Sequence, residues 1–391
     1  MLNYITYFFW ICIILVFYTY IGYSILLFLL VKISRFFYQK EKLTSNYQPN
    51  VTLLIAAYNE ESYIKEKIEN SLKLDYPKDK IQYLFVTDGS EDKTPDIVKE
   101  YPQIKLMHRS ERQGKIMAIE RAMPEVSSEI VIFTDANTSL NKDAITNIAR
   151  HFAKKKVGVV SGEKQILKRE ADQAAGAGEG FYWKYESKLK KWDDELYSVM
   201  GAAGELFAIR TKLFEPIPKD CLIEDFYLSF KIVQKGYKIA YEPDAYALEE
   251  PSASVKEELK RKVRIATGGI QSIVRLKELL NPFKYGVITF QYVSHRVLRW
   301  TLAPLALPII FILNAFLLGQ GWLFQYLFGA QCLFYLLAVI GYFLEKRLIR
   351  LKLLFIPYYF CMMNYAVYAG FIKYMKGSQS VLWEKAARRA G

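Results

Sequence analysis

The sequence predicts an α/β domain with an open sheet, joined to apolar helices that span a membrane. Three segments of the central chain repeat one order of elements: an apolar strand, a polar turn and a helix. Hydrophobic residues make up 52% of the chain and aromatic residues 15%, which is rich for a soluble protein. The apolar stretches lie at the two ends, so we expect one soluble domain over residues 45–280.

The N-terminal stretch, residues 4–31, predicts a transmembrane helix within 1–33. It has no charged residue and exceeds the roughly 20 residues that a helix needs to span a bilayer. It lacks the basic start and the small-residue cleavage site of a signal peptide. Basic residues follow it, and by the positive-inside rule they predict a cytoplasmic central domain: Lys32, Arg35, Lys40 and Lys42.

The C-terminal region, residues 301–375, predicts three more transmembrane helices. Its apolar stretches cover 302–319, 322–344 and 353–372. This number of spans puts the basic tail, 376–391, outside the cytoplasm, in conflict with the positive-inside rule. Either the tail lies in the interface or one apolar stretch does not cross. In both cases we predict an integral protein of a bacterial inner membrane.

The segment 281–300 joins the soluble domain to these spans. It mixes basic, aromatic and apolar residues and ends in Arg299 and Trp300. We interpret it as an amphipathic interfacial helix whose Trp300 is anchored at headgroup depth, where tryptophan is enriched.

Charge and cysteine content exclude several classes of function. The net charge of +13 is concentrated near the membrane edges and in 256–277. It favours anionic lipid or a polyphosphate ligand as partner, because no nucleic-acid-binding motif accompanies it. The four cysteines are scattered without a CxxC pair, which argues against disulfides and structural zinc. The sequence does not predict an oligomeric state.

The three strand–turn–helix units begin at residues 51, 81 and 129. Continuous apolar runs predict buried parallel strands, and ligands bind outside the carboxyl ends of such strands. We therefore expect the polar turns after the strands to converge on one crevice. These turns are Asn59 with Glu60, residues 88–92, and residues 135–137.

The crevice lacks the signatures of two common nucleotide sites. No GxGxxG follows the first strand and no GxxxxGK[ST] occurs, which argues against a dinucleotide cofactor and a P-loop. Asp135 and Asn137 provide oxygen ligands of the kind that Mg²⁺ or Mn²⁺ prefers. An ordinary Asx turn is the alternative explanation of this pair.

Seven motifs in order resemble those of the membrane-embedded family 2 glycosyltransferases, which include cellulose, hyaluronan and poly-N-acetylglucosamine synthases. The resemblance covers about residues 50–272, and the flanking helices only in arrangement. The motifs are "AAYNEE", "VTDGSEDKT", "RQGK", "FTDANT", "GAAGELFAIR", "IEDFYLSFKIVQKGYKIAYEP" and "RKVRIATGG".

The resemblance implies a Rossmann-like GT-A domain that binds a nucleotide-diphosphate sugar, with a preference for a UDP-sugar. It implies donor contacts from Ala57, Tyr58, Glu60, Asp88 and Lys115, and a metal–diphosphate site at Asp135 and Asn137. The family usually has Asp in place of Asn137, which weakens the expected metal binding. Without the resemblance, Lys115 is equally well explained as a solvated lysine at a helix start, and Asp88 as a turn former.

The resemblance places the acceptor sugar beside the "GAAGE" turn, with Gly201, Gly204 and Glu205. Small residues allow close approach of a ligand to the backbone, although tight packing alone also explains them. The preceding segment, 181–197, predicts an amphipathic helix against the membrane face or a helix on the surface of the soluble domain.

Glu224 and Asp225 are adjacent, so on a helix they point about 100° apart and cannot both face one acceptor hydroxyl. The local alternative is that Asp225 caps the N-terminus of the following helix. Inverting transfer needs one general base, and the resemblance assigns this role to Asp225, with Glu224 orienting the site. Cations near the leaving diphosphate would come from 261–264, above all Arg261 and Arg264.

One departure concerns the QxxRW motif of processive synthases, which lies at Arg261 to Ile265 in this chain. Ile265 stands where the family has an acceptor-stacking tryptophan, which puts processive synthesis in doubt. The sequence therefore leaves three functions open. The first is extension of a glycan or polysaccharide chain, the second a single transfer to a lipid acceptor, and the third, disfavoured by the intact carboxylates, non-catalytic nucleotide-sugar binding.

Overall fold

The sheet at the centre of the molecule contains eight strands. The structure is a computed structural model, and it describes residues 2–37, 43, 47–167, 176–251, 254–347 and 351–380. Within these residues the strand order is β3-β2-β1-β4-β7-β6-β8-β5. The strands are Val51–Ala57 (β1), Ile81–Asp88 (β2), Ile104–Arg109 (β3), Ile130–Asp135 (β4), Thr138–Leu140 (β5), Val157–Ile166 (β6), Leu206–Arg210 (β7) and Lys238–Glu249 (β8).

The three predicted strand units lie side by side as β2, β1 and β4, and all three are parallel. Ala57 is in register with Thr87, and Ala56 with Asp135. The polar turns after these strands therefore follow one edge of the sheet, as predicted. Strand β7 runs antiparallel to β4 and β6, which makes the sheet mixed, as in GT-A domains.

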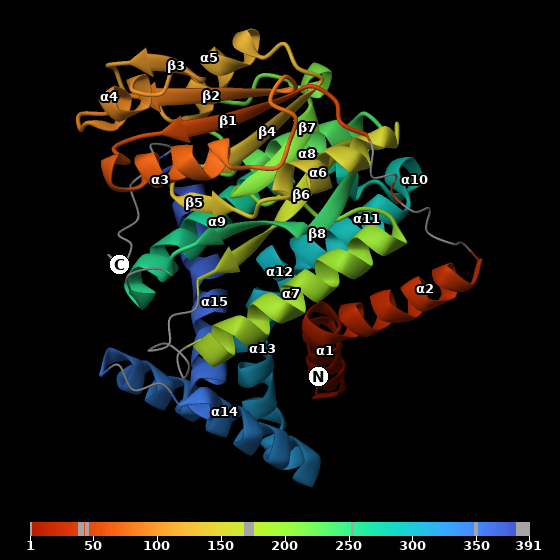
Figure 1. Ribbon diagram of the computed structural model, residues 1–391. Coiled ribbons are helices and arrows are strands. Elements are labelled where there is room, and N and C mark those ends of the chain that lie inside the picture. Colours follow the sequence, from red (N-terminus) through yellow and green to blue (C-terminus); the bar gives the residue numbers. More distant parts are fainter. Residues whose placement is uncertain are drawn as a thin grey trace.

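Helices cover both faces of the sheet, because side chains of a strand alternate between its two faces. Leu53 and Ile55 pack on the same side as α3, α4 and α6, whereas Leu54 packs on the side of α5, α8 and α9. These helices are Glu61–Leu72 (α3), Thr94–Lys99 (α4), Lys115–Ala122 (α5), Ala144–Ala149 (α6), Glu224–Gln234 (α8) and Val255–Arg275 (α9). The domain is thus a three-layer α/β sandwich (Figure 1).

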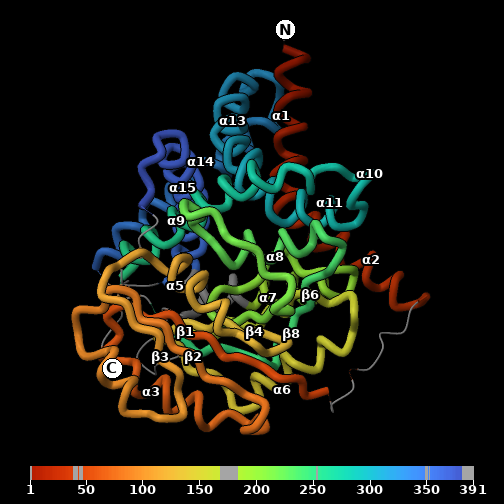
Figure 2. The backbone as a smooth tube through the Cα atoms, turned by 90° about the horizontal axis from the view of Figure 1, so that it is seen from above, coloured from red at the N-terminus to blue at the C-terminus, as the bar shows by residue number. Residues whose placement is uncertain are grey.

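Three helices of the described chain are long and apolar enough to cross a membrane: Leu2–Phe37, Leu302–Gln320 and Trp322–Lys346. The first comprises α1 (Leu2–Phe17), a π-helical turn and α2 (Tyr23–Phe37), and the other two contain α13 (Leu302–Leu317) and α14. Figure 2 shows α1, α13 and α14 on one side of the molecule and strands β1 to β3 on the other. Lys40 and Lys42, used above for orientation, lie outside the described residues.

The N-terminal helix changes direction, which the sequence did not predict. Helices α1 and α2 point in different directions on either side of the π-helical turn Tyr18–Gly22 (Figure 1). Extra residues inserted in a helical ladder are an established cause of such kinks. Helix α2 buries Tyr23, Leu27 and Val31, four residues apart, against Leu189 of α7 (Gly176–Leu196). The segment 181–197 therefore packs on α2.

The third predicted C-terminal span forms α15 (Lys352–Met375), which is not among the three candidate spans. Helix α15 packs along α9 of the soluble domain. Phe355, Tyr359 and Met362 contact Val255 and Leu259 of α9. Further along, a Cβ at Gly370 would lie 2.8 Å from the Ala266 side chain, so the two helices touch closely there.

The segment 281–300 is not the single amphipathic helix that we predicted. It consists of α10 (Pro282–Tyr285), α11 (Val287–Tyr292), a π-helical turn and α12 (Leu298–Trp300). Most of its middle is buried in the domain, including the polar side chains of Thr289, Gln291, Ser294 and His295. Two of its basic residues, His295 and Arg299, belong to a buried polar cluster.

That cluster joins the N-terminal helix, α7 and the segment before α13. At its centre, Asp193 of α7 accepts hydrogen bonds from the Tyr23 hydroxyl, from Gln291 Nε2 at 3.1 Å and pairs with His295 Nδ1 at 2.5 Å. Asp193, His295, Gln291 and Tyr23 are all fully buried. Because water cannot replace a lost partner in such a site, these bonds hold the membrane-side helices on the domain.

Asp193→Ala should therefore lower the unfolding temperature strongly, because it leaves the buried groups His295 Nδ1, Gln291 Nε2 and the Tyr23 hydroxyl without their shared carboxylate. Removing one partner of a buried pair costs about 3–5 kcal/mol. The matched control is Glu195→Ala two residues later, which removes an ion pair to Arg35, a side chain that is 58% exposed. Such exposed pairs contribute at most about 1 kcal/mol. Equal unfolding temperatures for the two variants in detergent would contradict the structural role of Asp193.

Candidate active site

The candidate active site lies at the carboxyl edge of β1, β2 and β4. A small pocket there brings together four of the predicted donor-binding residues: Ala57, Tyr58, Asp88 and Lys115. The Tyr58 ring is covered by the guanidinium of Arg112, 3.7 Å from the ring centroid. Arg112 belongs to the loop before α5, so this loop closes over the end of β1.

Asp88 holds that loop in place. Its Oδ2 accepts hydrogen bonds from the backbone N–H groups of Gln113 at 2.8 Å and Gly114 at 2.6 Å. Oδ1 lies 3.4 Å from Arg121 of α5. Asp88 is 4% exposed and thus shapes the wall of the pocket. The expected contact to a nucleoside remains a prediction.

Glu60 lies at the start of α3 and is 3% exposed, outside the residues that line this pocket. Its backbone N–H donates to Thr94 Oγ1 at 2.8 Å. The preceding Asn59 has a left-handed backbone, with φ 54°, and its Oδ1 accepts from the N–H of Glu91 at 2.9 Å. The turns after β1 and β2 are thereby tied together.

Lys115 is the centre of the site. Its Nζ lies 2.9 Å from Asp135 Oδ1 and 2.8 Å from Glu224 Oε1. Burial disfavours its charge, but the two carboxylates outweigh burial and raise the pKa of Lys115. Lys115 is therefore charged at neutral pH, and the solvated alternative is wrong, because its side chain is only 20% exposed.

The three carboxyl groups near Lys115 differ in how their pKa values are shifted. Burial raises the pKa of Asp135 more than Lys115 lowers it. For Glu224 burial is outweighed by Lys115, so the pKa is lowered. Burial and the neighbouring Glu224 charge together raise the pKa of Asp225 to about 7. Asp225 is thus the group that can exchange a proton near neutral pH.

Glu224 and Asp225 are the first two residues of α8, and Ile223 occupies the N-cap position. The alternative that Asp225 caps this helix is therefore wrong. Both carboxylates are nevertheless favourably placed, because the helix N-terminus carries partial positive charge.

The "GAAGE" turn lies directly against these acids. A Cβ at Gly204 would lie 3.1 Å from Asp225 Oδ2, and one at Gly201, where φ is 104°, would meet the Phe226 ring at 2.6 Å. Gly201 therefore requires glycine, and at Gly204 the absence of a side chain gives Asp225 its space. Glu205 pairs with Lys164 Nζ at 2.5 Å. Burial alone would raise the pKa of Glu205, but the Lys164 charge outweighs burial and lowers it.

The two predicted arginines of α9 have different surroundings. Arg261 forms a two-pronged pair with Glu258, at 3.0 and 2.9 Å, and lies 3.9 Å from Glu205. Arg264 donates to the Leu222 carbonyl at 3.4 Å, and its charge helps to lower the pKa of Glu224. Arg264 therefore interacts with the acidic pair through Glu224, whereas Arg261 interacts with Glu258 and Glu205.

Asn137 fits a metal–diphosphate site in part. Its Oδ1 is buried and makes no hydrogen bond in the described structure, so an oxygen donor is available beside Asp135. Among the described residues, no group of three or more His, Cys, Asp or Glu residues could hold a metal ion by itself. A divalent cation would thus draw most of its ligands from phosphate and water, as Mg²⁺ commonly does.

Trp300 packs against the soluble domain, and its expected position at headgroup depth stays a prediction. Its ring packs against Phe226, 5.3 Å between centroids, and a Cβ at Gly269 would meet it at 2.4 Å. Sequence distance concealed this contact, because Trp300 follows Phe226 by 74 positions. In the sequence, only the adjacent glycines of "ATGG" indicated that another segment could pack closely on this helix.

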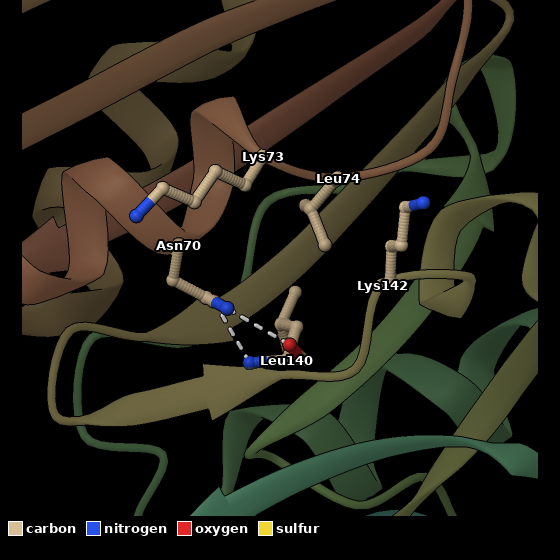
Figure 3. A pocket seen from close by; sticks show the side chains of 5 residues that line it. All are labelled: Asn70, Lys73, Leu74, Leu140 and Lys142. Carbon is tan, nitrogen blue, oxygen red and sulfur yellow. Dashed lines mark hydrogen bonds between the residues drawn. The ribbon is translucent and has the colours of Figure 1, made fainter.

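A second pocket lies away from these acids, between α3 and β5 (Figure 3). It is lined by Asn70, Lys73, Leu74, Leu140 and Lys142. Asn70 spans it, accepting from the Leu140 N–H at 2.8 Å and donating to its carbonyl at 2.9 Å. The pocket carries no carboxylate, so we do not assign it a chemical step.

Comparison with known proteins places residues 52–217 in the family model "Glycosyl transferase family 2". The beta-monoglucosyldiacylglycerol synthase of Trichormus variabilis is 33% identical over 178 residues, 43% of this chain and 36% of that protein. The poly-beta-1,6-N-acetyl-D-glucosamine synthase of Staphylococcus epidermidis is 26% identical over 233 residues, 58% of this chain and 56% of that protein. The matched region thus spans about a third and about half of these relatives.

A solved mannosyltransferase from Pyrobaculum calidifontis, in complex with GDP-mannose and Mn²⁺, has the same fold. It covers 95% of this chain and 100% of its own, with a TM-score of 0.68 and 24% sequence identity. The match extends beyond the sheet into the apolar helices, since these belong to the covered 95%. The predicted GT-A fold is thereby confirmed.

Lys115→Met should destabilise the protein in a pH-dependent way. Without the ammonium, Asp135 and Glu224 repel each other and their pKa values rise. A carboxyl group with a raised pKa in the folded state binds more protons folded than unfolded, so stability increases as pH falls. We expect the loss in unfolding temperature relative to wild type to be large at pH 8 and to shrink toward pH 5.

The control is Lys73→Met, which removes a lysine that is 78% exposed. Its unfolding temperature should follow that of wild type across this pH range. A Lys115→Met deficit that stays constant or grows on acidification would contradict the assigned charge state of the cluster.

Proposed function

We propose that the chain is an inverting glycosyltransferase acting at a membrane, because residues 52–217 match the family model "Glycosyl transferase family 2". It moves a sugar from a nucleotide-diphosphate sugar, with UDP-sugars as first candidates, onto a glycan or lipid-linked acceptor. The observation that carries this proposal is the group of Asp135, Lys115, Glu224 and Asp225. The Lys115 cation joins Asp135, the candidate metal-binding carboxylate, to Glu224, and the adjacent Asp225 has its pKa raised to about 7 by burial and by the Glu224 charge.

The pocket beside Tyr58 is suited to the nucleoside of the donor. Its walls combine the small Ala57, an aromatic ring and the Asp88 carboxylate. Arg112 already stacks on Tyr58, and a planar base can use such surfaces for stacking. The diphosphate would then extend toward Lys115, whose ammonium provides a phosphate contact.

Asp135 and Asn137 would hold a divalent cation, Mg²⁺ or Mn²⁺, through their oxygens together with the diphosphate. When bound, such a cation neutralises charge that develops on the leaving diphosphate. Lys115 supplies positive charge at the same place, and Arg264 adds to it from α9. Arg261 is less suited to this role, since Glu258 and Glu205 already neutralise it.

Asp225 acts as the general base in this proposal. It accepts the proton of the acceptor hydroxyl while that oxygen attacks the anomeric carbon from the side opposite the diphosphate. Glu224 does not face the same hydroxyl; it fixes Lys115, as their distance of 2.8 Å indicates. The glycine turn with Gly201, Gly204 and Glu205 borders the space where the acceptor would approach Asp225.

The acceptor can be a growing polysaccharide or a single lipid-linked molecule. Ile265 offers no ring for sugar stacking, and Trp300 is occupied by Phe226 and Gly269. This favours one transfer to a polyprenyl phosphate or glycolipid as a second candidate. The two relatives above are named for a glycolipid and for a polymer, and thus support both. A purely binding role is disfavoured by the converging acids.

The membrane topology follows from three crossings by α1, α13 and α14. If α15 stays beside α9, the chain returns to the side of the catalytic domain, and the basic tail lies there too. This arrangement removes the conflict with the positive-inside rule and supports a cytoplasmic domain. Phe283, fully exposed in α10, is suited to contact lipid.

Asp225→Asn should abolish sugar transfer and leave nucleotide binding intact. The amide keeps the size of the side chain but cannot accept the proton, which costs roughly 10²- to 10⁴-fold in rate. The control is Asp220→Asn in the loop before α8, whose side chain is 68% exposed and paired with Arg275. If Asp225→Asn transfers sugar from a labelled donor at a rate near that of wild type, Asp225 is not the general base.

The rate of transfer should rise with pH and level off above an apparent pKa of about 7, because only the ionised Asp225 is a base. Glu224→Gln removes the neighbouring negative charge, which lowers the pKa of Asp225 and shifts the profile to lower pH. A kcat/KM that falls as pH rises from 6 to 8 would argue against a carboxylate base. An unshifted pH–rate profile for Glu224→Gln would contradict the assigned effect of the Glu224 charge on the pKa of Asp225.

A further inference from the structure

Lys67 is a buried lysine with no role in the mechanism above. It lies on α3, one helix turn beyond Tyr63, and is 1% exposed. Its Nζ donates to Thr134 Oγ1 at 3.0 Å, to the Thr138 carbonyl at 2.8 Å and to Thr138 Oγ1 at 3.3 Å. All three acceptors are uncharged.

These acceptors lie at both ends of the turn that contains Asp135 and Asn137. Thr134 precedes Asp135 in β4, and Thr138 follows Asn137 at the start of β5. Thr138 Oγ1 also donates to the Asp135 carbonyl at 2.9 Å, which closes the turn. The Lys67 ammonium therefore binds the two strand ends from which the candidate metal ligands project.

The same group reaches the acceptor side of the site. Thr134 Oγ1 donates to the backbone carbonyl of Glu205 at 2.9 Å. Glu205 ends the glycine turn that lies against Asp225. One chain of hydrogen bonds thus joins Lys67, the Asp135 turn and the acceptor turn.

Structural packing alone accounts poorly for this lysine. A methionine of similar length could fill the space without the desolvation that a buried charge requires. Burial lowers the pKa of Lys67 to about 7, against the attraction of Asp135. Groups with strongly shifted pKa values concentrate at functional sites, where they orient other groups.

We propose that Lys67 is a positioning residue for the metal–diphosphate site, which fixes the 134–138 turn so that Asp135 and Asn137 present their oxygens together. This inference rests on the proposed function. Groups behind metal ligands orient them in the same way in other proteins, and their loss costs about 10- to 100-fold in metal affinity.

The test uses the full-length protein in detergent or lipid and measures binding of Mn²⁺ in the presence of UDP, from the electron paramagnetic resonance signal of free Mn²⁺. Lys67→Met should bind about 10- to 100-fold more weakly than wild type. Thr138→Val keeps the carbonyl that accepts from Lys67 but removes the hydroxyl that accepts from Lys67 and donates to the Asp135 carbonyl, so it should weaken binding in the same direction. If Lys67→Met fails to fold, the Mn²⁺ affinity of Thr138→Val tests the inference in its place.

Lys190→Met is the matched control. Lys190 of α7 is 8% exposed and pairs with Glu163 at 3.1 Å, so it too is a buried lysine. If buried lysines matter here only for folding, both lysine variants lose stability and keep the Mn²⁺ affinity of wild type. That result, or unchanged affinity in Thr138→Val when Lys67→Met is unfolded, overturns the inference. Failure of wild type to bind Mn²⁺ with UDP would instead contradict the proposed function.

Discussion

The Lys115 ammonium between Asp135 and Glu224 is the interaction on which the candidate site depends. It joins three parts of the chain: the start of α5, the end of β4 and the start of α8. Without a cation at this point, carboxyl groups from two of these elements would face each other in a buried site. Their repulsion would be strong, since buried charges are poorly screened by water and salt.

The same principle recurs where the domain meets the apolar helices. Asp193 and His295 pair in the interior, and Glu186 pairs with Arg299 nearby. Lys164 similarly lies between Glu205 and Glu249. The basic residues of this chain are thus partly internal, and the net charge of +13 is an incomplete guide to its surface.

Sequence reasoning predicted the sheet well because its signal is local. Each strand of the β2-β1-β4 group is a continuous apolar run followed by a polar turn, so strand direction and the converging edge could be inferred. The kink between α1 and α2 and the division of 281–300 into short helices were missed. Both depend on polar side chains that are buried by distant segments, as for Tyr18 with Ser294.

The candidate site was predicted in part for a related reason. Motifs identified Asp135, Glu224, Asp225 and also Lys115, but not that Lys115 pairs with two of these acids. The sequence around Lys67 predicts an ordinary helix, and only the fold brings Lys67 into contact with the 134–138 turn. The contact of Trp300 with Phe226 likewise had no local signature in the sequence.

The most direct test of the central claim is transfer from labelled nucleotide-diphosphate sugars by the purified full-length protein in lipid, with Mn²⁺ or Mg²⁺ and with the divalent ion removed. Nucleotide release and product size are measured together. The account predicts that one donor, with UDP-sugars as first candidates, is consumed in a metal-dependent way. High-polymer product would identify a synthase, and a short lipid-extractable product a single transfer. Absence of both nucleotide release and labelled product with every donor and acceptor lipid would contradict the account.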